Sequence, residues 1–370
     1  AALSISLNNM NDANELISFI ASMSGEGNLR VEENLGEGYV RLRVSEAERR
    51  QAKHDIQHVE DIVIEMLRNA RDAGADKVYL ATTKEDGVRT LVFLDIGSGV
   101  PQDMQERIFD ARVTSKLESM KMDRWGVHGR GMALFSIKQN TDEARVVASD
   151  VDLGSVFKVS VATDRLGERA DQSSWPQAVK DEDGHYVCAR GPHNIIRAAC
   201  EFALEELRAC DVYLGSPSEI AATLHAQASS RLDASRLLFI DDEAELPVVD
   251  RLGLASDAED FIRICSGLGL EMSERTAHRI LAGQIKPVRG VTARLLRERD
   301  SSSHASAPVD LAKDRRGLRI AKDDMAQFSR AVERDFNDLA SRYYLNLCGD
   351  PKIRVSRDRI TVTFDLAKEE

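Results

Sequence analysis

Residues 64–76, IEMLRNARDAGAD, combine three polar side chains with a helical apolar pattern. Glu65, Asn69 and Asp72 are spaced by four and three residues, so an α-helix carries all three on one face. A solvated charged face would account for Glu65 and Asp72, but it gives no reason for an asparagine inside a good helix. Apolar residues occupy a different stripe, which can pack against a sheet: Ile62, Met66, Ala70 and Ala73.

A second segment, LVFLDIGSGVP (91–101), runs an apolar strand into Asp95 and then into Gly97 and Gly99. A carboxylate at a strand end, beside glycines that let a ligand approach closely, suits hydrogen bonding to a purine amino group. A β-turn with Asp and Gly in their usual turn positions is the alternative.

A third segment, DRWGVHGRGMALFSIKQN (123–140), places Gly126, Gly129 and Gly131 before a short apolar helix. Free N–H groups at a helix start bind anions, and glycines let the backbone wrap phosphate oxygens. Taken alone, the segment could also be a flexible turn before a helix. Each of the three segments is a modest signal alone, but their order and spacing together are distinctive.

The three segments resemble the N, G1 and G2 boxes of the GHKL ATPases, the superfamily of gyrase, the heat-shock chaperone ATPases, histidine kinases and MutL. Gly154 and Ser155, which open the strand VFKVSV (156–161), are similar to the fourth box. The segment ARVTSKLESM (111–120) looks like the Thr-Ser-Lys lid of the MutL branch. The resemblance covers about residues 46–165.

The resemblance implies a site for ATP and Mg²⁺. Asn69 would be the magnesium ligand, because Mg²⁺ prefers oxygen ligands, and Glu65 would orient or deprotonate the attacking water. Asp95 would bind the adenine amino group, while the glycine backbone and Lys116 would hold the phosphates. The implied nucleotide-binding set is completed by Asp72, Gly97, Gly99, Gly126, Gly129, Gly131 and Ser155. Lid closure and dimerisation gate turnover in such enzymes, so a homodimer is expected on ATP binding.

The pattern of elements predicts an α+β fold. Ser45 and Glu48 form a capping-box signature that starts a helix, which breaks near residues 54–58 and ends at Gly74. Residues 46–165 are expected to form a two-layer α/β sandwich, a mixed sheet with helices on one face. The expected strands are KVYLAT (77–82), TLVFLD (90–95), ARVVAS (144–149) and GSVFKVSVAT (154–163).

Three further parts are expected around this domain. Residues 1–45 suggest a small β-α-β-β appendage with a hairpin turn at residues 34–37. Residues 166–300 suggest a mainly helical domain, and residues 301–370 begin with a low-complexity linker. The linker leads to a long helix over about 322–347 and to a terminal hairpin of KIRVS (352–356) and RITVTFDL (359–366).

The composition is ordinary for a globular protein, with 42% hydrophobic and 30% charged residues. A net charge of −12 argues against a nucleic-acid coat over the whole surface. The sequence has no run of about eighteen apolar residues, and its five cysteines show no paired spacing, so a cytoplasmic protein without a membrane partner is expected. His185, Cys188 and His193 lack a fourth ligand at a familiar spacing, which argues against a metal site there.

A local basic region follows in AEDFIRICSGLGLEMSERTAHRILAGQIKP (258–287), which is similar to the helix-turn-helix modules of phage repressors. Ser273 would begin the recognition helix and Gly283 would end it. The alternative is a helical hairpin with solvated charges. Between residues 275 and 299 the only acid is Glu298, against the basic residues Arg275, Arg279, Lys286, Arg289, Arg294, Arg297 and Arg299.

Two classes of function follow. The first is a GHKL-type ATPase that works as an ATP-gated clamp or conformational switch, with the helical half as its output toward a DNA or protein partner. The second is an ATP-binding regulatory protein that binds DNA through residues 257–299. A histidine-kinase-like phosphotransferase is a weaker alternative, because His54 and His58 lie too close to Glu65 for a separate dimerisation hairpin.

Overall fold

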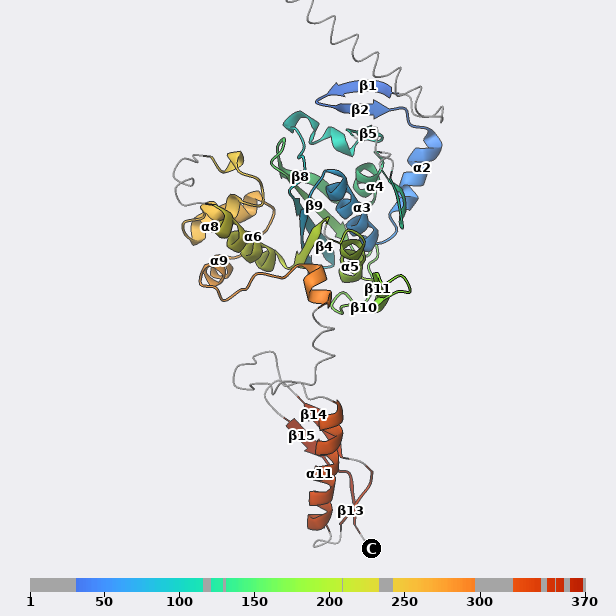
Figure 1. Ribbon diagram of the computed structural model, residues 1–370, viewed down its shortest axis with the longest axis vertical. Helices are drawn as coiled ribbons and strands as arrows, with labels where there is room; N and C mark the ends of the chain where they lie inside the picture. The colour runs from blue at the N-terminus through green and yellow to red at the C-terminus, as the bar shows by residue number, and fades with distance from the viewer. Residues whose placement is uncertain are drawn as a thin grey trace, which may run out of the picture. The chain divides into compact units, whose positions relative to one another are not determined.

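The computed structural model divides the chain into two compact units, Ala1–Arg299 and Asp300–Glu370 (Figure 1). Each unit is described by itself. None of the helices in the described part of the chain is long and apolar enough to cross a membrane. The structure describes residues 31–115, 121–128, 131–207, 209–232, 242–296, 322–340, 345–349, 351–355 and 360–368.

A five-stranded mixed sheet with the order β12-β3-β4-β9-β8 forms the centre of the first unit. Neighbouring strands are antiparallel except for β12, which runs parallel to β3. The register places Asp95 opposite Ser155 at the end of β4. The strands are β3 (Lys77–Glu85), β4 (Val88–Asp95), β8 (Glu143–Ser149), β9 (Ser155–Ala162) and β12 (Asp211–Gly215).

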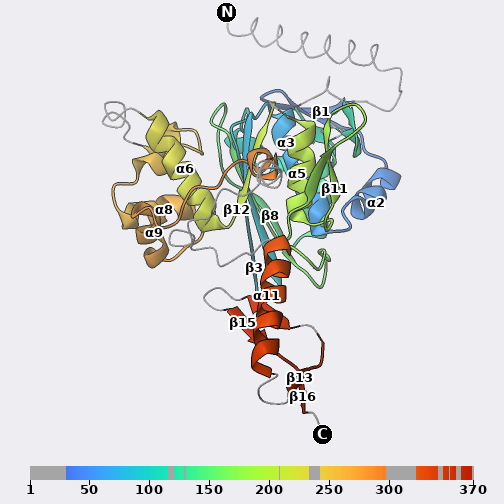
Figure 2. The same ribbon diagram turned by 60° about the horizontal axis from the view of Figure 1, so that its bottom comes forward.

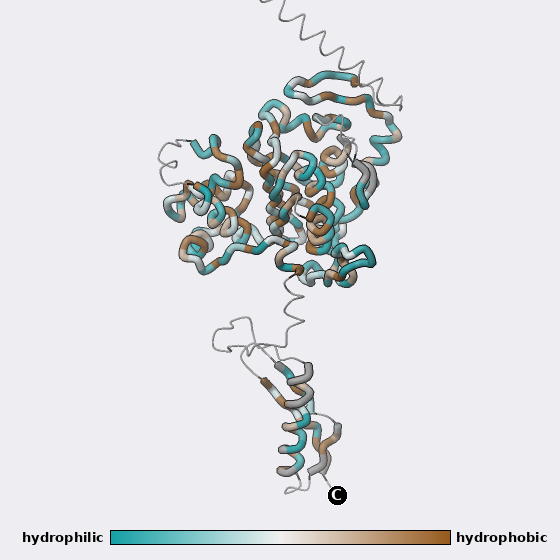
Figure 3. Tube along the Cα trace, in the orientation of Figure 1, coloured by the Kyte–Doolittle hydropathy of each residue, from teal (hydrophilic) through white to brown (hydrophobic). Residues whose placement is uncertain are grey.

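The helices of residues 46–165 pack on one face of the sheet, as expected, but helices from later in the chain cover its other face, which the sequence did not predict. Successive side chains of a strand point to opposite faces. Leu91 and Phe93 therefore enter one apolar core, whereas Val92 and Leu94 enter the other. An unbroken apolar run such as TLVFLD (90–95) is typical of a strand that is buried on both sides. Hydrophobic residues accordingly follow the central strands in Figure 3.

The first face is covered by α3 (Val59–Asp72), α4 (Ala133–Asn140) and α5 (Ile195–Glu205). The expected helix with a break is confirmed as α2 (Glu46–Asp55) followed by α3. The Ser45–Glu48 capping box begins α2, and Gly74, with φ +78°, follows the end of α3.

The opposite face is covered by α6 (Pro217–Arg231), α8 (Ala258–Gly267) and α9 (Glu274–Leu281). Figure 2 shows these helices and α3 with α5 on opposite sides of the strands. Ser273 caps α9 through a hydrogen bond from the Thr276 N–H, as the sequence predicts. The short 3₁₀ helices η3 (Glu243–Glu245) and η4 (Arg251–Leu254) belong to the same part of the chain.

The segment after residue 166 contributes directly to the central sheet. Helix α5 packs against α3, and the chain then continues into β12 beside β3. The proposed boundary near residue 166 stays a prediction, but α5 and β12 lie in the same compact unit as β3.

Three smaller sheets complete the first unit. The hairpin of β1 and β2 has its turn at Glu37 and Gly38, slightly later than the sequence suggested, and residues 1–30 are outside the described chain. The outer strands are β1 (Val31–Gly36), β2 (Tyr39–Leu42), β5 (Val113–Thr114), β6 (Lys121–Asp123), β7 (Gly126–His128), β10 (Gln177–Lys180) and β11 (Tyr186–Arg190), with η1 (Gln102–Met104) and η2 (Arg107–Phe109) between them in the chain.

The second unit contains α11 (Lys322–Ala340) and two pairs of short strands. The helix was expected to reach about residue 347, but Leu345–Leu347 forms β13 because it pairs with β16 (Leu366–Lys368). The predicted terminal hairpin is confirmed as β14 (Lys352–Val355) and β15 (Ile360–Thr363).

Candidate functional site

A cavity of about 570 Å³ opens on the α3 face of the sheet. This volume is typical of small-molecule sites. Its walls come from α3, the end of β4, the start of β9 and the segment before α4. Of the predicted site residues, the cavity brings together Glu65, Asn69, Asp72, Asp95, Gly99, Gly131 and Ser155.

The other predicted residues stand apart from this group. Gly97 lies behind the cavity wall against Ala73, and Gly126 begins β7; neither is among the lining residues. Lys116 and Gly129 fall outside the described residues, so their predicted roles stay predictions.

Asp95 is a buried carboxylate at the inner end of the cavity, with 4% of its surface exposed. Its Oδ1 atom accepts a hydrogen bond of 2.8 Å from the Gly97 N–H. Ser155, opposite in the ladder, is also buried, and its hydroxyl lies 3.1 Å from the Ser149 hydroxyl. The site therefore offers a carboxylate acceptor and a hydroxyl side by side at the ends of two strands.

The glycines near Asp95 are required by the packing of the chain on itself. Gly99 has φ +71°, and a Cβ atom there would lie 1.7 Å from the Asp150 carbonyl oxygen. A Cβ atom on Gly97 would lie 2.7 Å from the Cβ atom of Ala73. Gly131 has φ +66°, and a Cβ atom there would lie 2.8 Å from the Val113 carbonyl oxygen. The close approach of other parts of the chain thus explains these glycines, which the sequence pattern alone related only to ligand access.

Asn69 lies in the last half of α3 and lines the cavity. Its Nδ2 atom is buried and has no hydrogen-bond partner among the described residues. The nitrogen and oxygen of an asparagine amide exchange places when the group turns over. An unpartnered amide at a cavity wall fits the oxygen ligation that Mg²⁺ prefers.

Glu65 belongs to a buried group of charges. Its Oε1 atom lies 2.6 Å from Nη1 of Arg68, one turn further along α3. Arg68 in turn binds both carboxylate oxygens of Asp123, with Nε 2.9 Å and Nη2 3.0 Å away. The spacing of three residues could have predicted the first pair, but no local pattern could have indicated Asp123.

Asp72 points into the same group of charges. Its Oδ1 atom accepts a hydrogen bond of 3.0 Å from Nε of Arg71. The Nη1 atom of Arg71 also reaches Asp123 at 3.1 Å and Glu206 at 3.0 Å. Burial opposes the charge of Arg71, but the hydrogen bonds that it donates to Glu206, Asp72 and Asp123 raise its pKa above the usual value.

Arg112 is a further cation of the cavity wall that the sequence did not single out. It is 4% exposed, has φ +63°, and donates from Nη2 to the Glu48 carboxylate. Burial raises the pKa of Glu48, but hydrogen bonds from Ser45 and Arg112 outweigh this effect and lower it. The Arg112 N–H also donates to the Gly131 carbonyl at 2.8 Å. The backbone of Arg112 thus contacts the last glycine of the predicted cradle, while its guanidinium binds Glu48.

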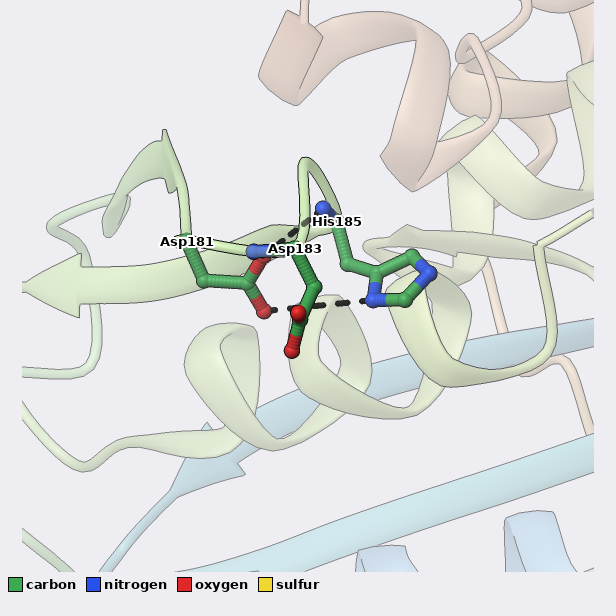
Figure 4. Close-up of side chains that lie close together, drawn as sticks. All are labelled: Asp181, Asp183 and His185. Atoms are coloured by element: carbon green, nitrogen blue, oxygen red, sulfur yellow. Dashed lines mark hydrogen bonds and ion pairs between the residues drawn. The ribbon is translucent and has the colours of Figure 1, made fainter.

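The hairpin turn between β10 and β11 gathers Asp181, Asp183 and His185 (Figure 4). All three are exposed, and Asp181 Oδ1 accepts hydrogen bonds from the Asp183 and His185 N–H groups. Burial raises the pKa of the nearby Cys188 thiol to about 11, so this thiol stays protonated at neutral pH. The turn geometry accounts for the cluster.

The helical pair α8 and α9 has the connectivity expected of a helix-turn-helix. Ala277 and Ile280 of α9 are buried against the second core. Arg275 and Arg279 lie on its exposed face and form no ion pair within the described part of the chain. The exposed side of α9 is therefore locally cationic.

Residues 56–149 match the family model described as "Histidine kinase-, DNA gyrase B-, and HSP90-like ATPase". No curated protein matches the chain. The matched segment begins at the end of α2 and ends with β8, so it includes α3 and the Asp95 strand. Helix α5, β12 and the helices of the opposite face all lie beyond it. Residues 56–149 are therefore similar to ATP-binding domains of the GHKL type.

Proposed function

We propose that the protein binds ATP with Mg²⁺ in the α3 cavity, hydrolyses it, and works as an ATP-gated clamp or conformational switch. The observation that carries this proposal is the convergence of Glu65, Asn69, Asp95 and Gly131 on one cavity from three distant segments. Asp95 binds the adenine amino group, and the backbone at Gly131 together with Lys116 holds the phosphates. Asn69 holds Mg²⁺, which neutralises phosphate charge when bound.

Glu65 acts on the water. Its carboxylate orients a water molecule beside the γ-phosphate and accepts the proton that this water loses. The water oxygen bonds to the γ-phosphorus as the bond to the β–γ bridging oxygen breaks, which releases ADP and phosphate. Arg68 places a cation 2.6 Å from this carboxylate and so helps to hold it in place.

A path from the cavity to the opposite face supports the role of a switch. The Ser98 carbonyl, next to Gly99 in the cavity wall, accepts a hydrogen bond of 2.9 Å from the Asp152 N–H. The neighbouring Leu153 carbonyl accepts one of 2.9 Å from the Val248 N–H, and Val248 belongs to the core of α6, α8 and α9. A shift of the Asp95–Gly99 loop on nucleotide binding would therefore be felt by the helical layer.

The finer assignments rest on sequence resemblance. A MutL-like branch is supported by the Thr114-Ser115-Lys116 segment, and dimerisation on ATP binding would follow from it. Phosphotransfer to histidine is less well supported, because His54 lies in α2 and His58 caps α3, which leaves neither on a separate hairpin.

The hydrolysis proposal is tested by phosphate release and equilibrium ATP binding in Glu65→Gln. We expect turnover to fall by roughly 10²-fold or more while affinity stays within a few-fold, because the residue acts on water and not on the nucleotide. Glu46→Gln removes an exposed carboxylate of α2 and serves as the matched control. A wild type that shows no turnover alone, with DNA or as a dimer would contradict hydrolysis and leave a binding switch.

DNA binding through α8 and α9 is the second candidate. Arg275 and Arg279 favour it, since both are exposed and form no ion pair with another described residue, and phosphate contacts need available cations. The full chain should then bind duplex DNA with an affinity that falls steeply with salt. Arg275→Ala should weaken binding at low salt, whereas Arg263→Ala, which removes an arginine already paired with Glu243, should not. Equal effects of the two substitutions would contradict this surface.

A further inference from the structure

The side chain of Arg68 in α3 is held by other side chains of the protein and not by solvent. Its side chain is 3% exposed, yet it lines the cavity. One edge of the guanidinium binds both oxygens of Asp123, and Nη1 reaches Glu65 at 2.6 Å. A planar guanidinium held at two places cannot rotate to follow one partner without losing the other.

Asp123 connects this arginine to the glycine segment. It ends β6, and its ladder partner in β7 is Gly126, the first glycine of the predicted cradle. Its Oδ1 atom also accepts a hydrogen bond of 3.0 Å from the Trp125 N–H, which fixes the turn of the hairpin. The same carboxylate is bound by Arg71 from the next turn of α3.

The network therefore has Glu65 at one end and the start of the glycine segment at the other. Its members are shielded from water: the side chains of Arg68, Asp123 and Arg71 are 3%, 7% and 10% exposed. Interactions between charges in such surroundings are strong and depend steeply on geometry. A displacement of the β6–β7 hairpin would move Asp123. The side chains of Arg68 and Glu65 would then have to move as well to keep their contacts.

We propose that Arg68 is a positioning residue, which aligns the Glu65 carboxylate only when the β6–β7 hairpin and its glycine segment are seated against α3. The inference rests on the hydrolytic role proposed for Glu65. Arg68 touches neither nucleotide nor water in this scheme. It transmits the state of the hairpin to the carboxylate, so that the water is aligned after the phosphates are enclosed.

The test compares Arg68→Lys and Asp123→Asn with wild type in steady-state turnover and ATP binding. Lysine keeps the charge but loses the two-point contact, and asparagine keeps the shape but loses the charge. We expect kcat to fall about 10- to 100-fold in each, the scale of a misaligned reacting group, with the ATP Kd changed by less than about 3-fold. Arg124→Lys, on the same hairpin but paired with Glu201 and Glu205 of α5, is the matched control and should leave kcat within about 2-fold.

Two further measurements separate positioning from a structural role. In a Glu65→Gln background, Arg68→Lys should change the residual turnover by less than about 3-fold, because both substitutions act through one carboxylate. In a Trp175→Phe background, Trp125 is the only tryptophan, and it lines the cavity beside Asp123. Binding of a non-hydrolysable ATP analogue should change the Trp125 fluorescence. In Arg68→Lys the analogue concentration at half-saturation should be the same as without this substitution, but the amplitude of the fluorescence change should be smaller.

The outcomes are distinguishable. A wild type without turnover, or a Glu65→Gln variant with full turnover, overturns the hydrolysis proposal and this inference together. If those two results are as expected, an unchanged kcat in Arg68→Lys overturns the inference alone. So does an ATP Kd that rises by the same factor as kcat falls. The third contrary result is a double variant in which the losses of turnover from Arg68→Lys and Glu65→Gln multiply. If Arg68→Lys does not fold, Asp123→Asn decides in the same way.

Discussion

The two faces of the central sheet are built from the same strands but carry different chemistry. On the α3 face, the charged or polar side chains of Arg68, Asp95 and Ser155 are buried and line the cavity. On the opposite face, the contacts of α6, α8 and α9 with the strands are formed mainly by apolar side chains, although the Tyr79 hydroxyl also donates to Gln227 of α6. Buried ion pairs add little net stability, whereas buried apolar area adds about 25 cal/mol per Å².

This difference indicates a division of work within one unit. The α3 face accepts desolvated charges because it holds a site, and the α6 face supplies a dry core against which the strands are fixed. The helices after residue 194 then support the proposed ATP site as part of the same compact unit. Three predictions test or sharpen this view.

The largest expected effect is the loss of core packing. Phe202 on the α3 face and Phe261 on the opposite face are both fully buried. Either change to alanine should lower the free energy of unfolding by about 3–5 kcal/mol. Trp125 and Trp175 are the only tryptophans and both lie in the first unit, so their fluorescence in a urea titration follows this unit.

Both variants should unfold in one transition if the two faces are one cooperative structure. Leu281→Ala in α9, where the side chain is 37% exposed, is the control and should have a much smaller effect. A separate early transition in Phe261→Ala would break the comparison, because the helical layer would then fold independently of the sheet.

The next effect concerns the loop that joins the two faces. In Gly99→Ala, the new Cβ atom meets the Asp150 carbonyl, and the residue keeps a positive φ. The left-handed conformation costs about 1–2 kcal/mol and overpacking about 1–3, so stability should fall by roughly 2–5 kcal/mol. Gly74 has a similar φ but open space around it, so Gly74→Ala should lose only the stability that the left-handed conformation costs. Equal losses in urea unfolding would show that the Asp150 contact is not required.

The smallest effect is on binding at the cavity alone. Asp95→Asn replaces a buried acceptor and should weaken ATP binding by about 1–3 kcal/mol, measured by calorimetry. An inosine nucleotide lacks the amino group, so its affinity should be weak in wild type and nearly unchanged in the variant. Unchanged ATP affinity in a folded Asp95→Asn protein would remove the adenine assignment.

Local sequence patterns predicted the elements around the site. The capping box at Ser45, the glycine at 74 and the apolar runs of β3 and β4 are short-range signals, and the structure confirms the elements they indicate. The grouping of Asn69 and Asp95 at one cavity followed from the resemblance of their spacing to a known family, which the match over residues 56–149 supports.

Features that depend on distant parts of the chain could not be predicted in this way. Arg68 and Asp123 are 55 residues apart, and helix periodicity shows only which face Arg68 occupies. The third layer was missed because a continuous apolar run does not say what covers its second side. The contacts behind Gly97 and Gly99 likewise come from Ala73 and Asp150, which no turn signature indicates.

The parallel pairing of β12 with β3 matters for any attempt to isolate the nucleotide site. In a fragment that stops near residue 165, one side of β3 would become an open sheet edge, with backbone N–H and C=O groups ready to pair with another chain. Tyr79 and Ala81 would also lose the cover of α6. Such a fragment could then self-associate by adding strands at the exposed edge of β3. This association would not depend on nucleotide, but it could be mistaken for ATP-driven dimerisation.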